Sequence, residues 1–204
     1  MKFLLSLLLA LTAAPAFAQA TPPDALVKSI TEDVIQIIRK DREIRAGNPK
    51  RIAEVVETKI LPYFDFARMT RIAMAVNWRR ATPEQQKALT EEFKTLLVRT
   101  YSNALTQYRD QVVDYKPLRA RPDDAEVTVK SEIRQKGAQS VALDYDLERT
   151  PAGWKVFDVK VGGVSLITTY REDFAGQVRE SGIDGLIKVL AAKNRSGETR
   201  KPAS

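Results

Sequence analysis

The sequence contains no cysteine and no histidine among its 204 residues. Without cysteine, the fold has no disulfide and the protein can carry out no thiol chemistry. Without histidine, it lacks the commonest general base and the commonest metal ligand, which excludes a serine–histidine triad and most zinc sites. We therefore expect a protein that is not an enzyme and that carries no metal or other cofactor.

Long apolar runs are also scarce, and the one that stands out lies at the N-terminus. Phe3 to Ala14 is largely apolar but shorter than the roughly 20 residues that span a bilayer. Lys2 precedes this run and Ala16-Phe17-Ala18 follows it, so the segment has the charged, apolar and small-residue parts of a secretory signal. We predict a cleaved signal peptide over residues 1–18 and export of the rest of the chain. No lipid anchor is expected, because the cleavage site has no cysteine.

The basic residues exceed the acidic ones, 33 against 26, which gives a formal net charge of +7. They are spread along the chain, with small clusters at Arg39-Lys40 and Arg79-Arg80. This distribution fits a solvated surface, and it also fits attraction to anionic lipid headgroups or to an acidic partner. Nucleic-acid binding is not expected, because export argues against it and no basic stretch alternates with stacking aromatics.

Apolar residues at helical spacing predict three helices near the start of the exported chain. The stripe from Leu26 to Ile38 is the first, and the helix is expected to end at Gly47. Residues 50–60 form the second. Asp65 is expected to cap a short third helix that ends near Val76.

A fourth helix has a strong start signal. Thr82 is placed as the cap, Pro83 as the first helical residue, and Gln85 as the partner that completes a capping box. Apolar residues then continue along one face as far as Tyr108. We expect one helix from 83 to 108, about 39 Å long.

The second half of the chain changes to period-two alternation. The predicted strands are residues 112–115, 127–133, 141–147 and 154–161. Charged residues alternate with apolar ones in the second and third of these, which is typical of antiparallel strands with one wet face. Helices are expected to follow over 165–180 and 184–193.

These elements indicate the α+β class: one domain, residues 19–194, with helices segregated to one face of a four-stranded, mostly antiparallel sheet. No internal repeat or long linker divides it. Residues 195–204 are polar and are predicted to be a disordered tail.

The turn between the last strand and the next helix is the most informative stretch. Gly162 and Gly163 allow a tight reversal, and Ser165 can cap the following helix by accepting a backbone N–H two or three residues on. Ser165 has no histidine partner and no Gly-x-Ser-x-Gly context, so it is not expected to be a nucleophile.

Several blocks of the sequence, in order, resemble the MlaC (toluene-tolerance) family. The blocks are Phe64–Arg71, Trp78–Gln86, Phe93–Tyr101, Gly153–Val159, Gly162–Leu166 with Tyr170-Arg171, and Gly182–Ile187. The resemblance implies a curved sheet wrapped by helices, akin to the nuclear-transport-factor-like cone. It also implies a monomeric periplasmic carrier of a diacyl phospholipid that maintains outer-membrane lipid asymmetry. Its partners would be an outer-membrane lipoprotein–porin complex and an inner-membrane ABC-type lipid transporter complex.

The apolar inner faces of the predicted elements would either pack against each other or, as the resemblance implies, enclose a pocket for lipid tails. The residues expected to line that pocket are Leu97, Tyr101, Leu105, Tyr108, Val129, Ile133, Leu143, Tyr145, Trp154, Phe157, Leu166, Ile167 and Tyr170. An exported adaptor with a filled core and a protein-binding basic face is the alternative.

Arginines are the candidates for contacts outside the tails. Arg68, Arg71 and Arg171 are candidates for the headgroup phosphate, because a guanidinium presents paired donors. Arg79 and Arg80, beside Trp78 in the turn before the long helix, are candidates for partner docking.

Overall fold

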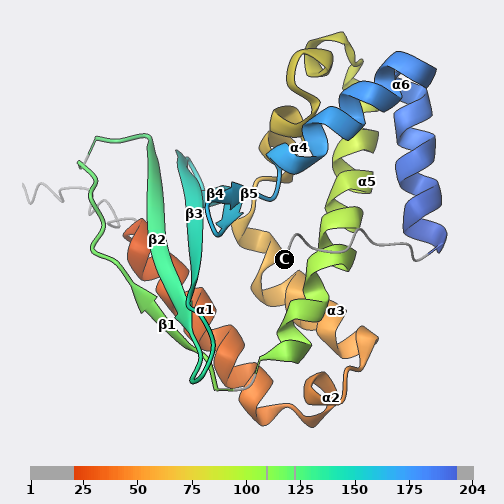
Figure 1. Ribbon diagram of the computed structural model, residues 1–204. Helices are drawn as coiled ribbons and strands as arrows, with labels where there is room; N and C mark the ends of the chain where they lie inside the picture. The colour runs from red at the N-terminus through yellow and green to blue at the C-terminus, as the bar shows by residue number, and fades with distance from the viewer. Residues whose placement is uncertain (1–20, 109, 122, 197–204) are drawn as a thin grey trace, which may run out of the picture.

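The computed structural model describes residues 21–108, 110–121 and 123–196, and the first half of this chain is helical (Figure 1). Its α-helices are α1 (Pro23–Lys40), α2 (Arg42–Arg45), α3 (Pro49–Lys59), α4 (Phe66–Met74) and α5 (Pro83–Tyr101). Its 3₁₀ helices are η1 (Leu61–Tyr63), η2 (Ala75–Arg80) and η3 (Ser102–Gln107). The predicted signal peptide and residues 197–204 of the predicted tail lie outside the described residues.

The second half forms the sheet and a terminal helix. The strands are β1 (Val112–Tyr115), β2 (Glu126–Arg134), β3 (Val141–Thr150), β4 (Gly153–Val161) and β5 (Val164–Ser165). They are followed by η4 (Thr168–Tyr170) and α6 (Arg171–Ser196). α6 extends two residues into the stretch that was predicted to be disordered.

Local capping sets where several of these helices begin. The capping box at α5 is present, with the Thr82 hydroxyl accepting from the Gln85 N–H and the Gln85 side chain accepting from the Thr82 N–H. Asp65 caps α4 by accepting from the Arg68 N–H at 2.8 Å. Asp41 stops α1 before the predicted Gly47, because its carboxylate accepts the first N–H groups of α2.

The predicted long helix is wrong in its last turns. α5 ends at Tyr101 and the chain continues as η3, so the α-helix is about 28 Å long. Ser102 donates its hydroxyl to the Val98 carbonyl, and Thr106 donates to the carbonyl of Asn103. Such residues compete for backbone groups and weaken a regular helix.

The sheet is antiparallel throughout in the order β1-β2-β3-β4-β5. It has a fifth strand that the sequence did not predict. Gly162 and Gly163 have φ values of 58° and 85°, so the chain reverses at once and Val164 pairs back onto Val161. The helix expected at 165 therefore starts at Arg171. The Ser165 hydroxyl still acts as a cap, accepting from the N–H of Thr168 at 2.9 Å.

The buried side chains form three clusters. The first joins α4, α5 and α6 around Phe93, the second joins α1 to the sheet around Leu147, and the third joins α1, α2 and α3 around Ile44. In Figure 1 the sheet with α1 lies on one side, and α4, α5 and α6 form a separate helical body on the other. The region where the three clusters meet is where a cavity can form.

Candidate functional site

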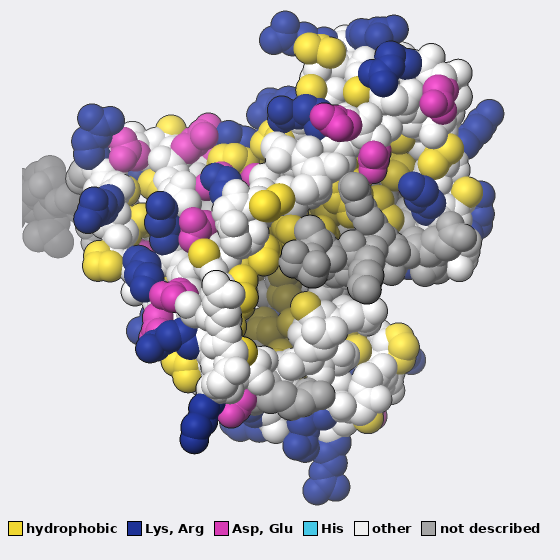
Figure 2. Space-filling model, in the orientation of Figure 1, with side chains coloured by type: hydrophobic (Ala, Val, Ile, Leu, Met, Phe, Trp, Pro, Cys, Tyr) yellow, Lys and Arg dark blue, Asp and Glu magenta, His cyan; other side chains and the backbone are white. Residues whose placement is uncertain are grey.

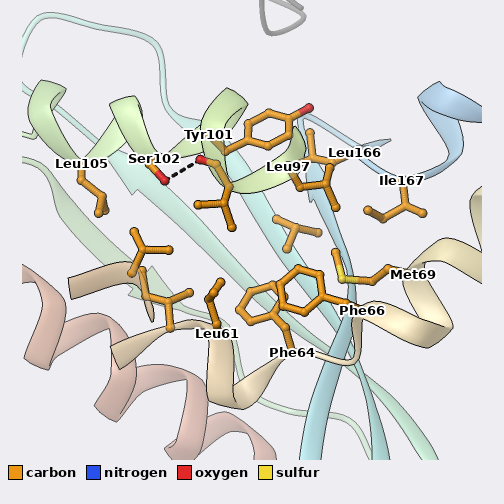
Figure 3. Close-up of a pocket in the computed structure, with 14 residues that line it drawn as sticks. Leu61, Phe64, Phe66, Met69, Leu97, Tyr101, Ser102, Leu105, Leu166 and Ile167 are labelled. Atoms are coloured by element: carbon orange, nitrogen blue, oxygen red, sulfur yellow. Dashed lines mark hydrogen bonds between the residues drawn. The ribbon is translucent and has the colours of Figure 1, made fainter. Parts of the chain in front are cut away.

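Two adjoining cavities occupy that region. The first, which we call the helix lobe, has a volume of about 210 Å³ and lies among α3, η1, α4, α5, η3, β4 and the segment that follows β5 (Figure 3). It is lined by Val56, Ile60, Leu61, Phe64, Phe66, Met69, Leu97, Val98, Tyr101, Ser102, Leu105, Val159, Leu166 and Ile167.

The second cavity, which we call the sheet lobe, has a volume of about 410 Å³ and lies between α1 and the inner face of the sheet. It is lined by Val27, Ile30, Thr31, Val34, Ile35, Ile38, Ile60, Tyr63, Phe64, Ala104, Leu105, Gln107, Tyr108, Gln111, Val113, Ile133, Leu143, Tyr145 and Val156.

The two lobes adjoin each other. Ile60, Phe64 and Leu105 belong to the walls of both. In Figure 2, a hollow with a hydrophobic floor lies between the sheet and the helical body. The site therefore has the size and the apolar lining of a pocket for a small molecule.

The helix lobe is built by three segments that are distant in sequence. Leu97, Tyr101 and Leu105 recur every four residues along α5 and η3, so they share one face. Phe64 and Phe66 stack with ring centroids 5.9 Å apart. In Figure 3 the labelled side chains from α5, from the segment around Phe64 and from the Leu166 turn converge on one space.

Backbone hydrogen bonds hold two of these walls against β4. The N–H of Asp65 donates to the Val156 carbonyl at 2.9 Å, which fixes the segment that carries Phe64 and Phe66. The N–H of Leu166 donates to the Val159 carbonyl at 2.8 Å. The Ser102 hydroxyl is turned back onto the Val98 carbonyl (Figure 3). The helix lobe therefore presents mainly carbon to a ligand.

The sheet lobe has more polar groups in its wall. Arg39, at the end of α1, donates to the Tyr108 hydroxyl at 2.8 Å, and that hydroxyl donates to the Gln111 carbonyl at 3.1 Å. Deeper along α1, the hydroxyl of Thr31 donates to the Val27 carbonyl at 2.8 Å. Burial raises the pKa of Tyr145, so this phenol is a neutral hydroxyl at physiological pH.

The structure brings most of the predicted tail-pocket residues together, divided between the lobes. Leu97, Tyr101, Leu105, Leu166 and Ile167 line the helix lobe. Leu105, Tyr108, Ile133, Leu143 and Tyr145 line the sheet lobe.

Four predicted residues lie elsewhere. Phe157 follows Val156, which faces the sheet lobe, so the pleat sends its ring to the opposite face. There the Arg68 guanidinium lies 3.5 Å from the ring centroid. Val129 and Trp154 are buried in the cluster between α1 and the sheet. Tyr170 packs edge-on against Phe93, at 5.0 Å, inside the helical body.

The headgroup candidates do not line either lobe. Arg68 is 13% exposed and forms ion pairs with Glu126, at 2.7 Å, and with Glu148. Its guanidinium is committed to two carboxylates and a ring, which does not favour phosphate binding, and the role of Arg68 stays a prediction. Arg171 donates to the Ile72 carbonyl at 3.2 and 3.3 Å and is exposed, as is Arg71. For these two as well, the role stays a prediction.

Several wall residues were missed by sequence reasoning. Val56 and Ile60 lie in the second predicted helix, and Ile30 and Val34 lie on the apolar stripe of the first, but none of the four was among the predicted pocket residues. Phe64 and Phe66 flank the cap residue Asp65 in a block that carried the family resemblance. An aromatic on each side of a helix cap was the available signal that this segment packs as a wall.

Comparison with known proteins assigns the chain to a family. The sequence matches the family model described as MlaC protein over residues 28–192. The chain belongs to the MlaC family. Among curated relatives of MlaC type, the toluene tolerance protein ttg2D of Pseudomonas putida is 29% identical, and the match covers 82% of this chain and 77% of that protein. The intermembrane phospholipid transport system binding protein MlaC of Haemophilus influenzae is 23% identical, covering 83% and 81%.

A solved structure that contains a bound ligand supports the same family assignment. The phospholipid-binding protein of Ralstonia solanacearum, solved in complex with a phospholipid, is 42% identical with a TM-score of 0.80. The match covers 87% of this chain and 99% of that one. The predicted α+β fold is confirmed, with one more strand than expected. In the described part of this MlaC-family chain, no helix is long and apolar enough to cross a membrane.

Proposed function

We propose that this MlaC-family protein is a periplasmic carrier that holds the acyl chains of a diacyl phospholipid in the two lobes and leaves the headgroup near water. The proposal rests on the two adjoining apolar cavities. The alternative, a protein-binding adaptor, requires a filled core in their place. The likeness to a phospholipid-bound protein at 42% identity supports it.

The energetics of lipid transfer suit such a carrier. Each CH₂ group removed from water contributes about 0.8 kcal/mol, so two sixteen-carbon chains, with about 30 such groups, contribute on the order of 25 kcal/mol. A lipid therefore does not cross an aqueous compartment unaided at a useful rate. Transfer from a bilayer into an apolar pocket exchanges one dry environment for another, so loading and unloading can both occur.

The proposed partners are an outer-membrane lipoprotein–porin complex and an inner-membrane ABC-type transporter, between which the protein shuttles lipid to maintain outer-membrane asymmetry. A relative named as the binding protein of an intermembrane phospholipid transport system supports this proposal. Arg79 and Arg80 are both exposed on η2, and Arg80 donates to the Asn77 side chain at 3.2 Å. We propose this exposed basic pair as a docking surface for an acidic partner.

The test of lipid carriage is direct. Protein purified from the periplasm of its host is extracted with organic solvent, and the extract is analysed by mass spectrometry and by phosphorus assay. We expect diacyl phospholipid at about one molecule per chain. An extract without phospholipid, from protein that also takes up none from vesicles, would contradict the proposal and favour the protein-binding adaptor.

A further inference from the structure

Several polar residues in the wall of the sheet lobe gather on one segment of the chain. Gln107, Tyr108 and Gln111 all follow Leu105, the residue at which the two lobes meet. Tyr108 lies three residues after Leu105, which is one turn of a 3₁₀ helix or about 6 Å, and side chains at this spacing point the same way. Gln107 is exposed, so this part of the wall reaches the protein surface. The polar segment is therefore close both to the meeting point of the lobes and to water.

An arginine from α1 lies against this polar segment. Arg39 follows Ile38, which lines the sheet lobe, and its Nη2 donates to the Tyr108 hydroxyl at 2.8 Å. Its guanidinium carbon also lies 5.7 Å from the centroid of the Tyr108 ring. The Tyr108 hydroxyl donates in turn to the Gln111 carbonyl at 3.1 Å. The exposed side chain of Arg39 is thus held at the rim of the lobe by a residue of the wall.

Arg39 differs from Arg68 in having no acidic partner. Arg68 is committed to Glu126 and Glu148. Among the residues that the structure describes, no carboxylate pairs with Arg39, and the Tyr108 hydroxyl is the acceptor that it uses. A guanidinium carries several N–H donors, and this hydrogen bond occupies one of them. An anionic ligand can therefore bind Arg39 without breaking an ion pair.

The charge around Arg39 favours an anion. Residues 39–45 contain four basic and two acidic residues, and α2, which carries Arg42 and Arg45, packs against η3. Of the two acids, Asp41 is already paired with Arg51 at 2.7 Å. In Figure 2, basic side chains project from the lower end of the molecule, where Figure 1 places α2. A negative group at this rim therefore meets a positive potential.

A phosphate group has the chemistry that this rim recognises. A guanidinium presents paired donors that match two phosphate oxygens, and a phosphate that stays at the surface avoids the cost of burying its charge. In a diacyl phospholipid the phosphate lies close to the point from which the two chains diverge, and the two lobes diverge at Leu105. Free phosphate offers the same oxygens without the chains.

We propose that Arg39 binds the phosphate of the carried phospholipid and that Tyr108 positions its guanidinium. The inference rests on the proposed carriage of a diacyl phospholipid and gives the headgroup a contact at the end of α1. The phosphate lies in water beside Arg39, and the chains enter the lobes on either side of Leu105. Because this contact is made to the phosphate alone, the site accepts phospholipids that differ beyond it.

The test compares a lipid that has the phosphate with one that lacks it. Delipidated protein is incubated with vesicles of phosphatidylglycerol that contain diacylglycerol with the same acyl chains, and the bound lipids are quantified by mass spectrometry. Arg39→Gln should lower the ratio of bound phosphatidylglycerol to bound diacylglycerol by about three- to fivefold, the effect of one exposed charge pair. The difference from wild-type protein should shrink at high salt.

The positioning role of Tyr108 has its own readout. Tyr108→Phe removes the acceptor that holds Arg39 and should lower the same ratio by less than Arg39→Gln does. In the double variant, Tyr108→Phe should add nothing to the effect of Arg39→Gln, because the two residues act through one contact. If Tyr108→Phe lowers the ratio equally with and without Arg39, Tyr108 does not act through the guanidinium.

Lys40→Gln is the matched control for charge. Lys40 is the next residue of α1 and is exposed, but it lies with Asp33 and Asp41 beside a different surface pocket. It should keep the wild-type ratio. An equal loss in Lys40→Gln and Arg39→Gln, or an unchanged ratio in Arg39→Gln, would overturn the contact at Arg39.

Two further outcomes separate the source of the phosphate from the carriage itself. Delipidated wild-type and Arg39→Gln proteins are titrated with inorganic phosphate in a calorimeter. Binding of inorganic phosphate that depends on Arg39, together with an unchanged lipid ratio, would assign this residue to free phosphate and overturn the lipid contact. Uptake of neither lipid by wild-type protein would overturn the proposed carriage, whereas uptake of both without an effect of Arg39→Gln would overturn the phosphate contact alone.

Discussion

The two lobes are lined by similar apolar side chains but differ in what their polar groups do. In the helix lobe, the Ser102 hydroxyl bonds to the chain's own backbone, so the wall offers a ligand mainly carbon. In the sheet lobe, Thr31, Tyr108 and Tyr145 bring hydroxyls to a mainly apolar wall. The helix lobe therefore offers a bound chain apolar contact alone, whereas the sheet lobe also offers polar groups.

The largest expected effect comes from placing a charge where the lobes meet. Leu105 lines both lobes and is only half-buried, so an aspartate there can draw water into an empty cavity. With lipid present, the carboxylate lies against the acyl chains at a cost of several kcal/mol. We expect Leu105→Asp to fold and to lose bound phospholipid by more than about tenfold, measured as phosphorus per chain.

Leu89 is the matched control, since it is 0% exposed inside the helical body. Leu89→Asp has no cavity to hydrate its charge and should lose about 4 kcal/mol of unfolding free energy or more. If Leu105→Asp unfolds as readily as Leu89→Asp, the two lobes are filled core in solution and the comparison between them fails.

Leu89 and Leu105 also show what could not be predicted from the sequence. Both lie on the same predicted apolar face, and nothing local distinguishes a leucine that packs from one that faces a cavity. Signals acting within three or four residues, such as the capping box at Thr82 and the cap at Ser165, were predictable because both partners are visible in the sequence. Arg68 was not, since its carboxylate partners lie 58 and 80 residues away.

A change at Arg68 tests the helix lobe separately from the sheet lobe. The contacts of Arg68 lie on the outer face of the sheet. Its ion pairs and its ring contact hold α4, and with it the Phe64–Phe66 wall of the helix lobe. Removing one partner of a largely buried pair leaves the carboxylates unpaired. We expect Arg68→Ala to lower the unfolding free energy by about 2 kcal/mol in urea titrations and to speed loss of bound lipid.

The control is Arg71→Ala, on the same helix but exposed. It should change stability by less than about 0.5 kcal/mol. Equal stability of the two variants would mean that the outer-face ion pairs do not hold the wall.

Asp158 lies next to the wall of the helix lobe, and its ionisation can be followed by changing the pH. It is buried on β4 beside Val159, accepts from the Val159 N–H, and burial raises its pKa above the ordinary value of 3.8. A raised pKa means that the folded state binds the proton more tightly than the unfolded state. The contribution of Asp158 to stability is therefore most favourable at low pH and falls as pH rises through its folded pKa.

Asp158→Asn removes this titration and keeps an acceptor. The unfolding free energy of wild-type protein relative to the variant should fall as the pH is raised above about 4 and should level off once Asp158 is ionised in both states. Denaturant titrations in steps of pH measure the difference. A constant difference across the range would show that Asp158 is hydrated in solution and not buried.

The smallest expected effect lies away from both lobes, at η2, where Arg79 and Arg80 are exposed. Exposed charges act mainly on the rate of association and its salt dependence. We expect Arg79→Glu with Arg80→Glu to slow lipid delivery to vesicles bearing the partner complexes by a few-fold at low salt, and less at moderate salt.

Stability and phosphorus per chain should stay unchanged, because neither residue lines a lobe. Reversal of the exposed Lys28 serves as a control for net charge. An unchanged delivery rate at both salt concentrations would remove η2 from docking while leaving the roles of the two lobes intact.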